Sequence, residues 1–223
     1  MLRRIVASLA AALMIAAGIG VSSPVASAAG ACTLSVPNRI VIGHPYMAVT
    51  LRASGPCATS GGYGSWVLYH PTQGGQAIAI FDGAPTDIWN VYSWDVKFGR
   101  QNWRPSWAWD GGYNDLAQNS PDVDVRLATA AWISSSRYGS TVTLKGTSLV
   151  YSTGNDSYFK RSAGAGFQYR ERGSTTWRTL KSMWTSSAGT TTMSYRSTAR
   201  RDYRFVLYTT PISWDQASAT TTR

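Results

Sequence analysis

The stretch NWRPSWAWDGGYND, residues 102–115, brings together aromatic rings, carboxylates and amides, the residue types suited to binding a sugar or a metal ion. Its polar end, WDGGYND, is typical of a loop that follows a strand. Large aromatic side chains at such a place can stack on a sugar ring or dock a protein partner. The predicted ligand-binding residues are therefore Trp107, Trp109 and Tyr113.

The carboxylates of this stretch could instead serve catalysis. Glycoside hydrolysis uses two carboxyl groups about 5 to 10 Å apart, and Asp110 and Asp115 flank the four residues 111–114. Asp beside Gly and Asn is also ordinary turn chemistry, because the carboxylate accepts hydrogen bonds from the local backbone. We therefore expect a turn here rather than a catalytic pair.

Calcium binding is a third possibility for the same loop. Hard oxygen ligands recur over residues 110–124, although their spacing differs from that of an EF-hand. Calcium therefore stays open as a cofactor, and no other cofactor is expected. The candidate metal ligands are Asp110, Asn114 and Asp115, with Asp122 and Asp124 nearby in sequence.

Nucleophilic catalysis finds little support in the sequence. A Ser–His–acid arrangement needs a histidine to take the proton, and His44 and His70 are the only two histidines of the chain. His70 lies at a strand end before a turn, where a solvated histidine is common, and no G-x-S-x-G motif is present. The sequence therefore indicates a protein that is not an enzyme.

The excess of positive over negative charge lies entirely in the second half of the mature chain. Residues 29–138 carry seven Lys or Arg and seven Asp, whereas residues 139–223 carry twelve Lys or Arg and four Asp or Glu. Such asymmetry reflects a partner or solubility rather than a fold, and no nucleic-acid motif accompanies it. The arginines expected to contact an anionic surface are Arg170, Arg172, Arg196, Arg200, Arg201 and Arg204.

The first 28 residues have the pattern of a cleaved signal peptide. Arg3 and Arg4 precede an apolar run over 5–21, and Ala26-Ser27-Ala28 forms a small-residue cleavage site. No second apolar stretch approaches the ~20 residues that span a bilayer. We expect a secreted or cell-wall-associated protein without a membrane span in its mature chain. In that oxidising environment, Cys32 and Cys57 should form a disulfide.

The mature chain is predicted to be all-β. Strand and turn formers dominate, and Glu171 is the only glutamate. The Ser-rich stretch 134–140 lies between two alternating runs and is predicted to be a linker. It would separate a Trp-rich, disulfide-bonded β-sandwich over 29–133 from a basic β-sandwich over 141–223.

Alternation also predicts how the aromatic residues of the first domain are oriented. In a strand, side chains two apart share a face. Tyr92, Trp94, Val96 and Phe98 should therefore face the core, with Ser93, Asp95 and Lys97 in solvent. The same argument places Trp103, Pro105, Trp107 and Trp109 on one face of the next segment.

Residues 139–223 resemble a known class of module. The hairpin QYRERGSTTWRTLK, a Gly-centred turn and RDYRFVLY are similar to the Ig-like or fibronectin-III-like β-sandwiches of secreted bacterial surface proteins, with Tyr203 at the place of a tyrosine corner. For these residues the resemblance implies an Ig-like sandwich and an extracellular binding or spacer role, without catalytic residues. For the whole mature chain we expect two tandem Ig-like β-sandwiches. We expect a protein that binds a glycan, cell wall or cell surface; the alternative is an adaptor or inhibitor subunit of an extracellular assembly.

Overall fold

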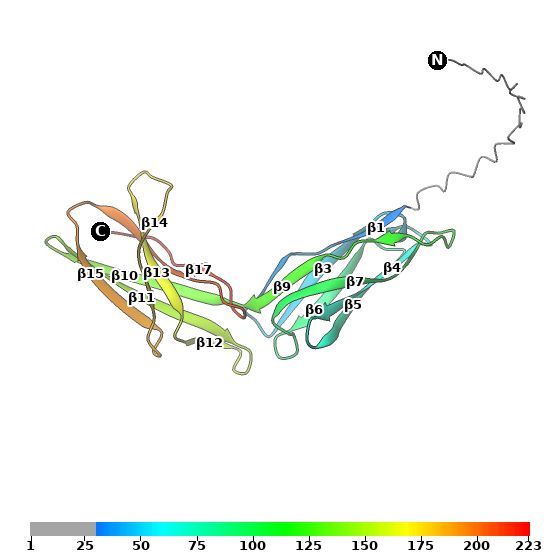
Figure 1. The fold of residues 1–223 in the computed structure, drawn as a ribbon, viewed down its shortest axis with the longest axis horizontal. Helices are drawn as coiled ribbons and strands as arrows, with labels where there is room; N and C mark the ends of the chain where they lie inside the picture. The colour runs from blue at the N-terminus through cyan, green and yellow to red at the C-terminus, as the bar shows by residue number, and fades with distance from the viewer. Residues whose placement is uncertain (1–29) are drawn as a thin grey trace, which may run out of the picture.

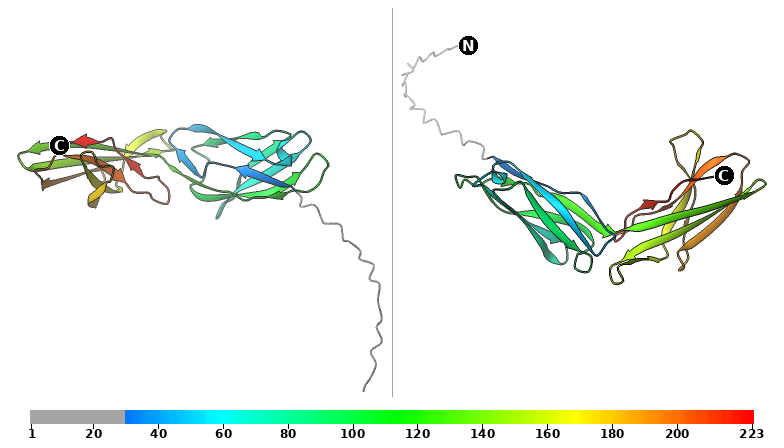
Figure 2. Two further views of the ribbon diagram at one scale, coloured as in Figure 1. Left: turned by 90° about the horizontal axis from the view of Figure 1, so that it is seen from above. Right: turned by 180° about the vertical axis from the view of Figure 1, so that it is seen from behind.

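The computed structural model describes residues 30–223, which form two β-sandwiches placed end to end with a bend between them (Figures 1 and 2). The predicted all-β sandwich fold is confirmed. A single 3-10 turn, Pro56–Ala58, accompanies the strands. Among the residues described, no helix has the length and apolar character needed to cross a membrane. The predicted signal peptide, residues 1–28, lies outside the described part of the chain.

The first sandwich consists of a four-stranded and a five-stranded sheet. The four-stranded sheet has the order β6 (Thr86–Tyr92), β3 (Tyr46–Ser54), β1 (Ala31–Ser35) and β8 (Ala117–Gln118). The five-stranded sheet has the order β2 (Arg39–Ile42), β9 (Asp122–Leu127), β7 (Gly99–Trp109), β4 (Tyr63–His70) and β5 (Gly74–Asp82).

Large aromatic side chains fill the core between these sheets. Trp66 and Phe81 meet edge to face at 5.8 Å between ring centroids, and Trp89 and Trp103 do so at 5.6 Å. Such contacts add to the stabilisation from burying the rings. The predicted disulfide between Cys32 and Cys57 is present and buried in this core.

The second sandwich also has two sheets, which share the interior between them. One contains β10 (Thr129–Tyr138), β11 (Thr141–Ser152) and β12 (Ser157–Lys160), with β15 (Thr190–Arg196) paired to β11. The other contains β14 (Arg178–Trp184), β13 (Gly164–Glu171), β16 (Arg201–Leu207) and β17 (Gln216–Ala217), with β18 (Thr221–Thr222) paired to β16.

Tyr203 lies fully buried in the second core, but it does not make the hydrogen bond of a tyrosine corner. In that motif the hydroxyl bonds to the backbone. Here the Tyr203 hydroxyl pairs with the hydroxyl of Tyr195 at 2.5 Å. Burial and this hydrogen bond both raise the pKa of Tyr203 above its usual range.

The predicted linker over 134–140 is wrong. Residues 134–138 belong to β10, which pairs with β11 along its whole length, and a tight turn at Gly139 joins the two strands. Ser134 and Ser136 occupy the solvent side of this regular strand, whereas Ser135 is half-buried and its hydroxyl pairs with that of Thr221. The chain passes from one sandwich to the other at Ala128, between β9 and β10.

The predicted core face over Tyr92–Phe98 is wrong for Tyr92 and Trp94, whereas Val96 and Phe98 are half-buried and pack against the core. β6 ends at Tyr92, and its buried residues are Trp89 and Val91, so the opposite parity faces the core. The chain then turns, with the amides of Asp95 and Val96 both donating to the Tyr92 carbonyl. Trp94 is consequently 72% exposed, whereas its neighbour Ser93 is buried.

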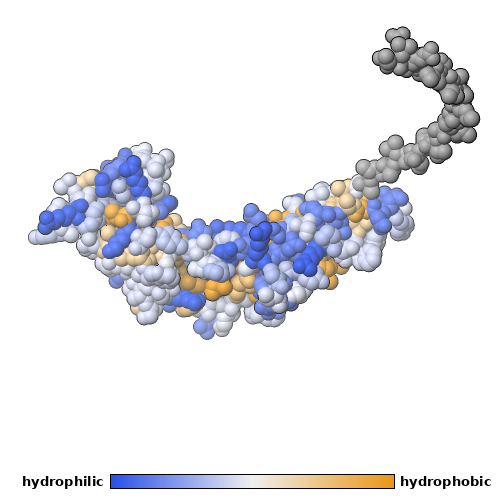
Figure 3. Space-filling model, viewed as in Figure 1, coloured by the Kyte–Doolittle hydropathy of each residue, from blue (hydrophilic) through white to orange (hydrophobic). Residues whose placement is uncertain are grey.

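The two sandwiches are joined by specific contacts around Trp214. Its indole Nε1 donates to the Ile40 carbonyl at 2.8 Å. The guanidinium groups of Arg39 and Arg126 lie 4.0 and 4.6 Å from its ring centroid. Backbone hydrogen bonds at Leu127 extend the contact. Hydrophobic residues reach the surface near the point where the sandwiches meet (Figure 3).

Candidate functional site

A β-bulge in β7 determines which tryptophans reach solvent. Ser65 pairs with Trp107 and Trp66 with Pro105, so Ser106 has no partner on β4. The extra residue shifts the alternation by one. Trp103 therefore faces the core and is fully buried, whereas Trp107, beyond the bulge, is 68% exposed. The prediction that these two tryptophans share a face is wrong for this reason.

Tyr63, Trp107 and Trp109 form a surface on the outer side of the five-stranded sheet, here called the aromatic face. The rings of Tyr63 and Trp109, paired across β4 and β7, are stacked with centroids 4.3 Å apart and planes 13° apart. Trp107 lies two cross-strand pairs along, opposite Ser65 and on the same side of the sheet. The Ser65 hydroxyl hydrogen-bonds the backbone N–H and carbonyl of Trp107, which fixes the bulge.

Apolar and charged residues border the aromatic face. Ile78 and Ile80 of β5 are exposed beside β4, and Asp82 pairs with Tyr63 in the same register. On the other strand, the Arg104 guanidinium lies 4.5 Å from the centroid of the Tyr69 ring. The surface therefore offers flat rings with hydrogen-bonding groups at its edges.

Tyr113 is exposed in the loop that follows β7, as a residue with positive φ of 61°. Its amide donates to the Asp110 carbonyl at 2.9 Å, which closes a tight turn. Trp109 and Asp115 form an isolated bridge at the base of the loop. Tyr113 is thus held in the loop directly after β7, four residues beyond Trp109.

The carboxylate of Asp110 organises this loop. It accepts hydrogen bonds from the amides of Gly112 and Asn114 at 2.8 and 2.9 Å, and from the Asn114 side chain at 3.0 Å. These donors hold the pKa of Asp110 below its usual range. Within residues 30–223, no three His, Cys, Asp or Glu side chains gather closely enough to hold a metal ion. The calcium site stays a prediction.

The six predicted arginines are distributed over several environments. The guanidinium groups of Arg170 and Arg204 both contact the Trp177 ring, at 4.8 and 4.3 Å from its centroid. Arg170 also pairs with Asp202, and Arg201 pairs with Glu171. Burial beside Arg170 lowers the pKa of Arg204. The remaining three, Arg172, Arg196 and Arg200, are exposed.

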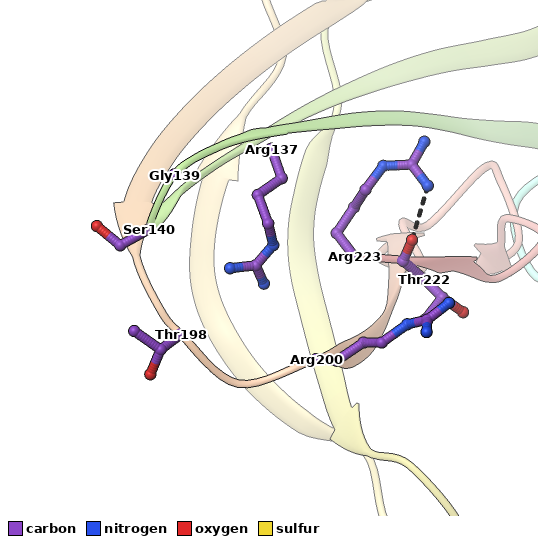
Figure 4. Close-up of a pocket in the computed structure, with 7 residues that line it drawn as sticks. All are labelled: Arg137, Gly139, Ser140, Thr198, Arg200, Thr222 and Arg223. Carbon is purple, nitrogen blue, oxygen red and sulfur yellow. Dashed lines mark hydrogen bonds between the residues drawn. The ribbon is translucent and has the colours of Figure 1, made fainter.

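Two further groups escape the sequence argument. Tyr46, Tyr92 and Trp94 form a second exposed aromatic cluster at the end of the four-stranded sheet, with neighbouring centroids 5.3 and 5.5 Å apart. Arg200 lines a pocket together with Arg137 and Arg223 (Figure 4). Both groups are brought together by pairing between strands that are distant in sequence. Only the turn after Tyr92 could have been recognised from neighbouring residues.

Comparisons with known proteins return no family. No protein-family model matches the chain, and no curated protein matches its sequence. Among solved structures, the human OSCAR ligand-binding domain is 14% identical, with 87% of this chain and 97% of that chain covered and a TM-score of 0.25. The D0-D1 domain of intimin is 12% identical, with 86% and 98% covered and a TM-score of 0.28.

A third solved structure is that of native Escherichia coli alpha-2-macroglobulin. It is 10% identical over 88% of this chain, with a TM-score of 0.42, and the match covers 14% of that much longer chain. At these identities and TM-scores, the similarities carry no argument about function. The function has to be inferred from the surfaces of this chain itself.

Proposed function

We propose that this chain is a secreted, non-enzymatic protein that binds an extracellular glycan or wall polymer through its aromatic face. The observation that carries the proposal is the exposed Trp107 beside the stacked Trp109–Tyr63 pair. The core of the same sandwich is already filled by Trp66, Trp89 and Trp103. The two outer tryptophans are therefore not needed as core fillers.

The geometry of the aromatic face suits a sugar ring. Stacking requires flat, exposed rings, and specificity requires a few polar groups at their edges. Asp82 beside Tyr63 offers carboxylate acceptors, and Arg104 offers guanidinium donors. The Cys32–Cys57 disulfide supports an oxidising, extracellular location.

Strand addition by a protein partner is less well supported at this sheet. β5 is its edge strand, beside the aromatic face. The Asp87 carboxylate already accepts the hydrogen bond of the outward Ile80 amide at 2.9 Å. A carboxylate on an edge strand blocks pairing with another chain. The adaptor or inhibitor alternative therefore lacks an open edge at this position.

Retention on insoluble polysaccharides tests the proposal. The protein is incubated with purified cell wall, chitin and cellulose, and the bound fraction is measured. Trp107→Ala should reduce the affinity for the retained polymer about tenfold or more, the size of effect seen at binding hot spots. Trp109→Ala should do the same, and the folded state of each variant is checked by thermal melting.

Trp94→Ala is the matched control. Trp94 has the same side chain, a similar exposure and the same domain, but it belongs to the other aromatic cluster. It should leave retention unchanged. Equal retention of the Trp107→Ala and wild-type proteins on every polymer would refute glycan binding by the aromatic face.

A further inference from the structure

We propose that a pocket at the far end of the second sandwich binds the oxyanion group, carboxylate or phosphate, of an anionic saccharide. The pocket lies beside the turn that joins β10 and β11, at the end of the domain away from the first sandwich (Figures 1 and 4). Its volume is about 580 Å³, within the range of small-molecule sites. It is lined by Arg137, Gly139, Ser140, Thr198, Arg200, Thr222 and Arg223.

The charged side chains that line this pocket are all of one sign. Three arginines line it and no carboxylate side chain does. None of the three forms a salt bridge within residues 30–223. The nearest acidic side chains of β13 and β16 are already engaged, because Glu171 pairs with Arg201 and Asp202 with Arg170. Gathered positive charge without a partner attracts an anion.

Two of the guanidinium groups are held in place before any ligand arrives. Arg137 donates to the carbonyls of Ser197 and Ala199. Arg223 donates from Nε to the Ser135 carbonyl at 3.0 Å and from Nη1 to its neighbour Thr222 at 2.7 Å. A guanidinium has five N–H donors, so each retains others that can form the paired hydrogen bonds favoured by carboxylate and phosphate.

The remaining lining residues suit the sugar that carries the anion. Ser140 and Thr198 also line the pocket, and their hydroxyl groups can donate or accept hydrogen bonds. Gly139 lies exposed at the turn that borders the pocket. A ring substituent can therefore extend out of the pocket toward a longer chain.

This inference goes beyond the proposed function and does not depend on it. The pocket is formed by the second sandwich alone and shares no residue with the aromatic face. Loss of glycan retention in Trp107→Ala would leave the pocket intact. Loss of anion binding in a pocket variant would likewise leave the aromatic face intact.

Nuclear magnetic resonance of the arginine Nε–Hε groups provides the test. The affinity tag is placed at the N-terminus, because a C-terminal tag would adjoin Arg223. Galacturonate and glucose 6-phosphate are titrated separately, with galactose and glucose as their neutral counterparts. The acids should shift the resonances of Arg137, Arg200 and Arg223, and the neutral sugars should not. The two acids distinguish carboxylate from phosphate as the preferred group.

Arg200→Gln removes an exposed guanidinium and should weaken binding about tenfold or more, as expected for a lost hydrogen bond to a charged group. Arg52→Gln is the matched control, because it removes one exposed positive charge from the first sandwich and should change nothing. Binding should also weaken steeply as salt is raised.

Three outcomes would overturn the proposal. They are the absence of shifts with both acids, equal binding by the Arg200→Gln and Arg52→Gln proteins, and equal binding of an acid and its neutral counterpart. Inorganic phosphate provides a further arm. If it bound as tightly as glucose 6-phosphate, the saccharide part of the proposal would be wrong.

Discussion

Gly146 lies on the inner side of β11, directly against the Phe205 ring of the opposite sheet. A Cβ atom at this position would lie 2.5 Å from the ring carbons. The absence of a side chain therefore lets the two sheets approach at this point, and Phe205 fills the space that a larger residue would take. Single side chains of this kind determine how closely the second core packs.

Gly146→Ala should consequently lower the free energy of unfolding by about 1–3 kcal/mol, the usual cost of overpacking a core. Urea denaturation followed by fluorescence measures this change. Gly154→Ala is the control, since no atom lies within 4 Å of its Cβ position, and it should stay within about 0.5 kcal/mol of wild type. A neutral Gly146→Ala variant would contradict the packing argument.

The stability of the second sandwich should fall in alkaline solution because of Tyr203. Burial raises its pKa in the folded state, whereas the phenol of the unfolded chain ionises near pH 10. The contribution of Tyr203 is therefore complete below about pH 10 and is lost as the pH rises above it. Tyr203→Phe should show a shallower loss of stability above pH 10 in chemical denaturation. Tyr138→Phe, at a side chain that is 91% exposed, should keep the wild-type slope.

At the scale of elements, alternation of side chains predicts the strands well and their orientation less well. The strands around Val123 and Val142 are where the pattern indicates. Elsewhere, two local irregularities change which side of the sheet the side chains face, namely the bulge at Ser106 and the turn after Tyr92. Neither changes composition or hydrophobicity, because a bulge is defined by pairing with a partner strand. Trp107 and Trp109 could be predicted as surface residues, but the stacking of Tyr63 on Trp109 could not.

The disulfide is the element-level constraint that the sequence does define. It links β1 to the 3-10 turn before β4, at a sequence separation of 25 residues. Replacing both Cys32 and Cys57 by Ala should destabilise the first sandwich by about 3 kcal/mol, since the unfolded chain regains the entropy of an open loop. Calorimetry should show a lower transition temperature for this sandwich, and an unchanged transition would argue against a structural role.

At the scale of the whole molecule, the contacts around Trp214 decide how the two sandwiches behave together. Arg39 and Arg126 belong to the first sandwich and flank an indole from the second. The sequence predicted two sandwiches but placed their boundary about ten residues too late, inside a hairpin. It could not predict the junction, because Arg39 and Trp214 are brought together only by the fold.

Trp214→Ala should uncouple the sandwiches. The substitution removes the hydrogen bond to Ile40 and the ring that contacts the guanidinium groups of Arg39 and Arg126. Calorimetry should then resolve two separate transitions, and small-angle scattering should show a broader distribution of maximum dimensions. Tyr138→Ala, at a side chain that is 91% exposed beside the turn between β10 and β11, should alter neither. A Trp214→Ala protein that scatters and melts like the wild type would show that other contacts maintain the arrangement.

The same junction has a consequence for selectivity. The aromatic face lies on one sandwich and the arginine-lined pocket on the other. If the contacts at Trp214 hold the bend fixed, they also hold the two proposed sites at a constant separation. A polymer long enough to reach both would gain from the high effective concentration of its second attachment point, whereas a short oligosaccharide would occupy one site at a time. The protein would then discriminate among polymers by length as well as by chemistry, and the contacts of Trp214 would determine which length is favoured.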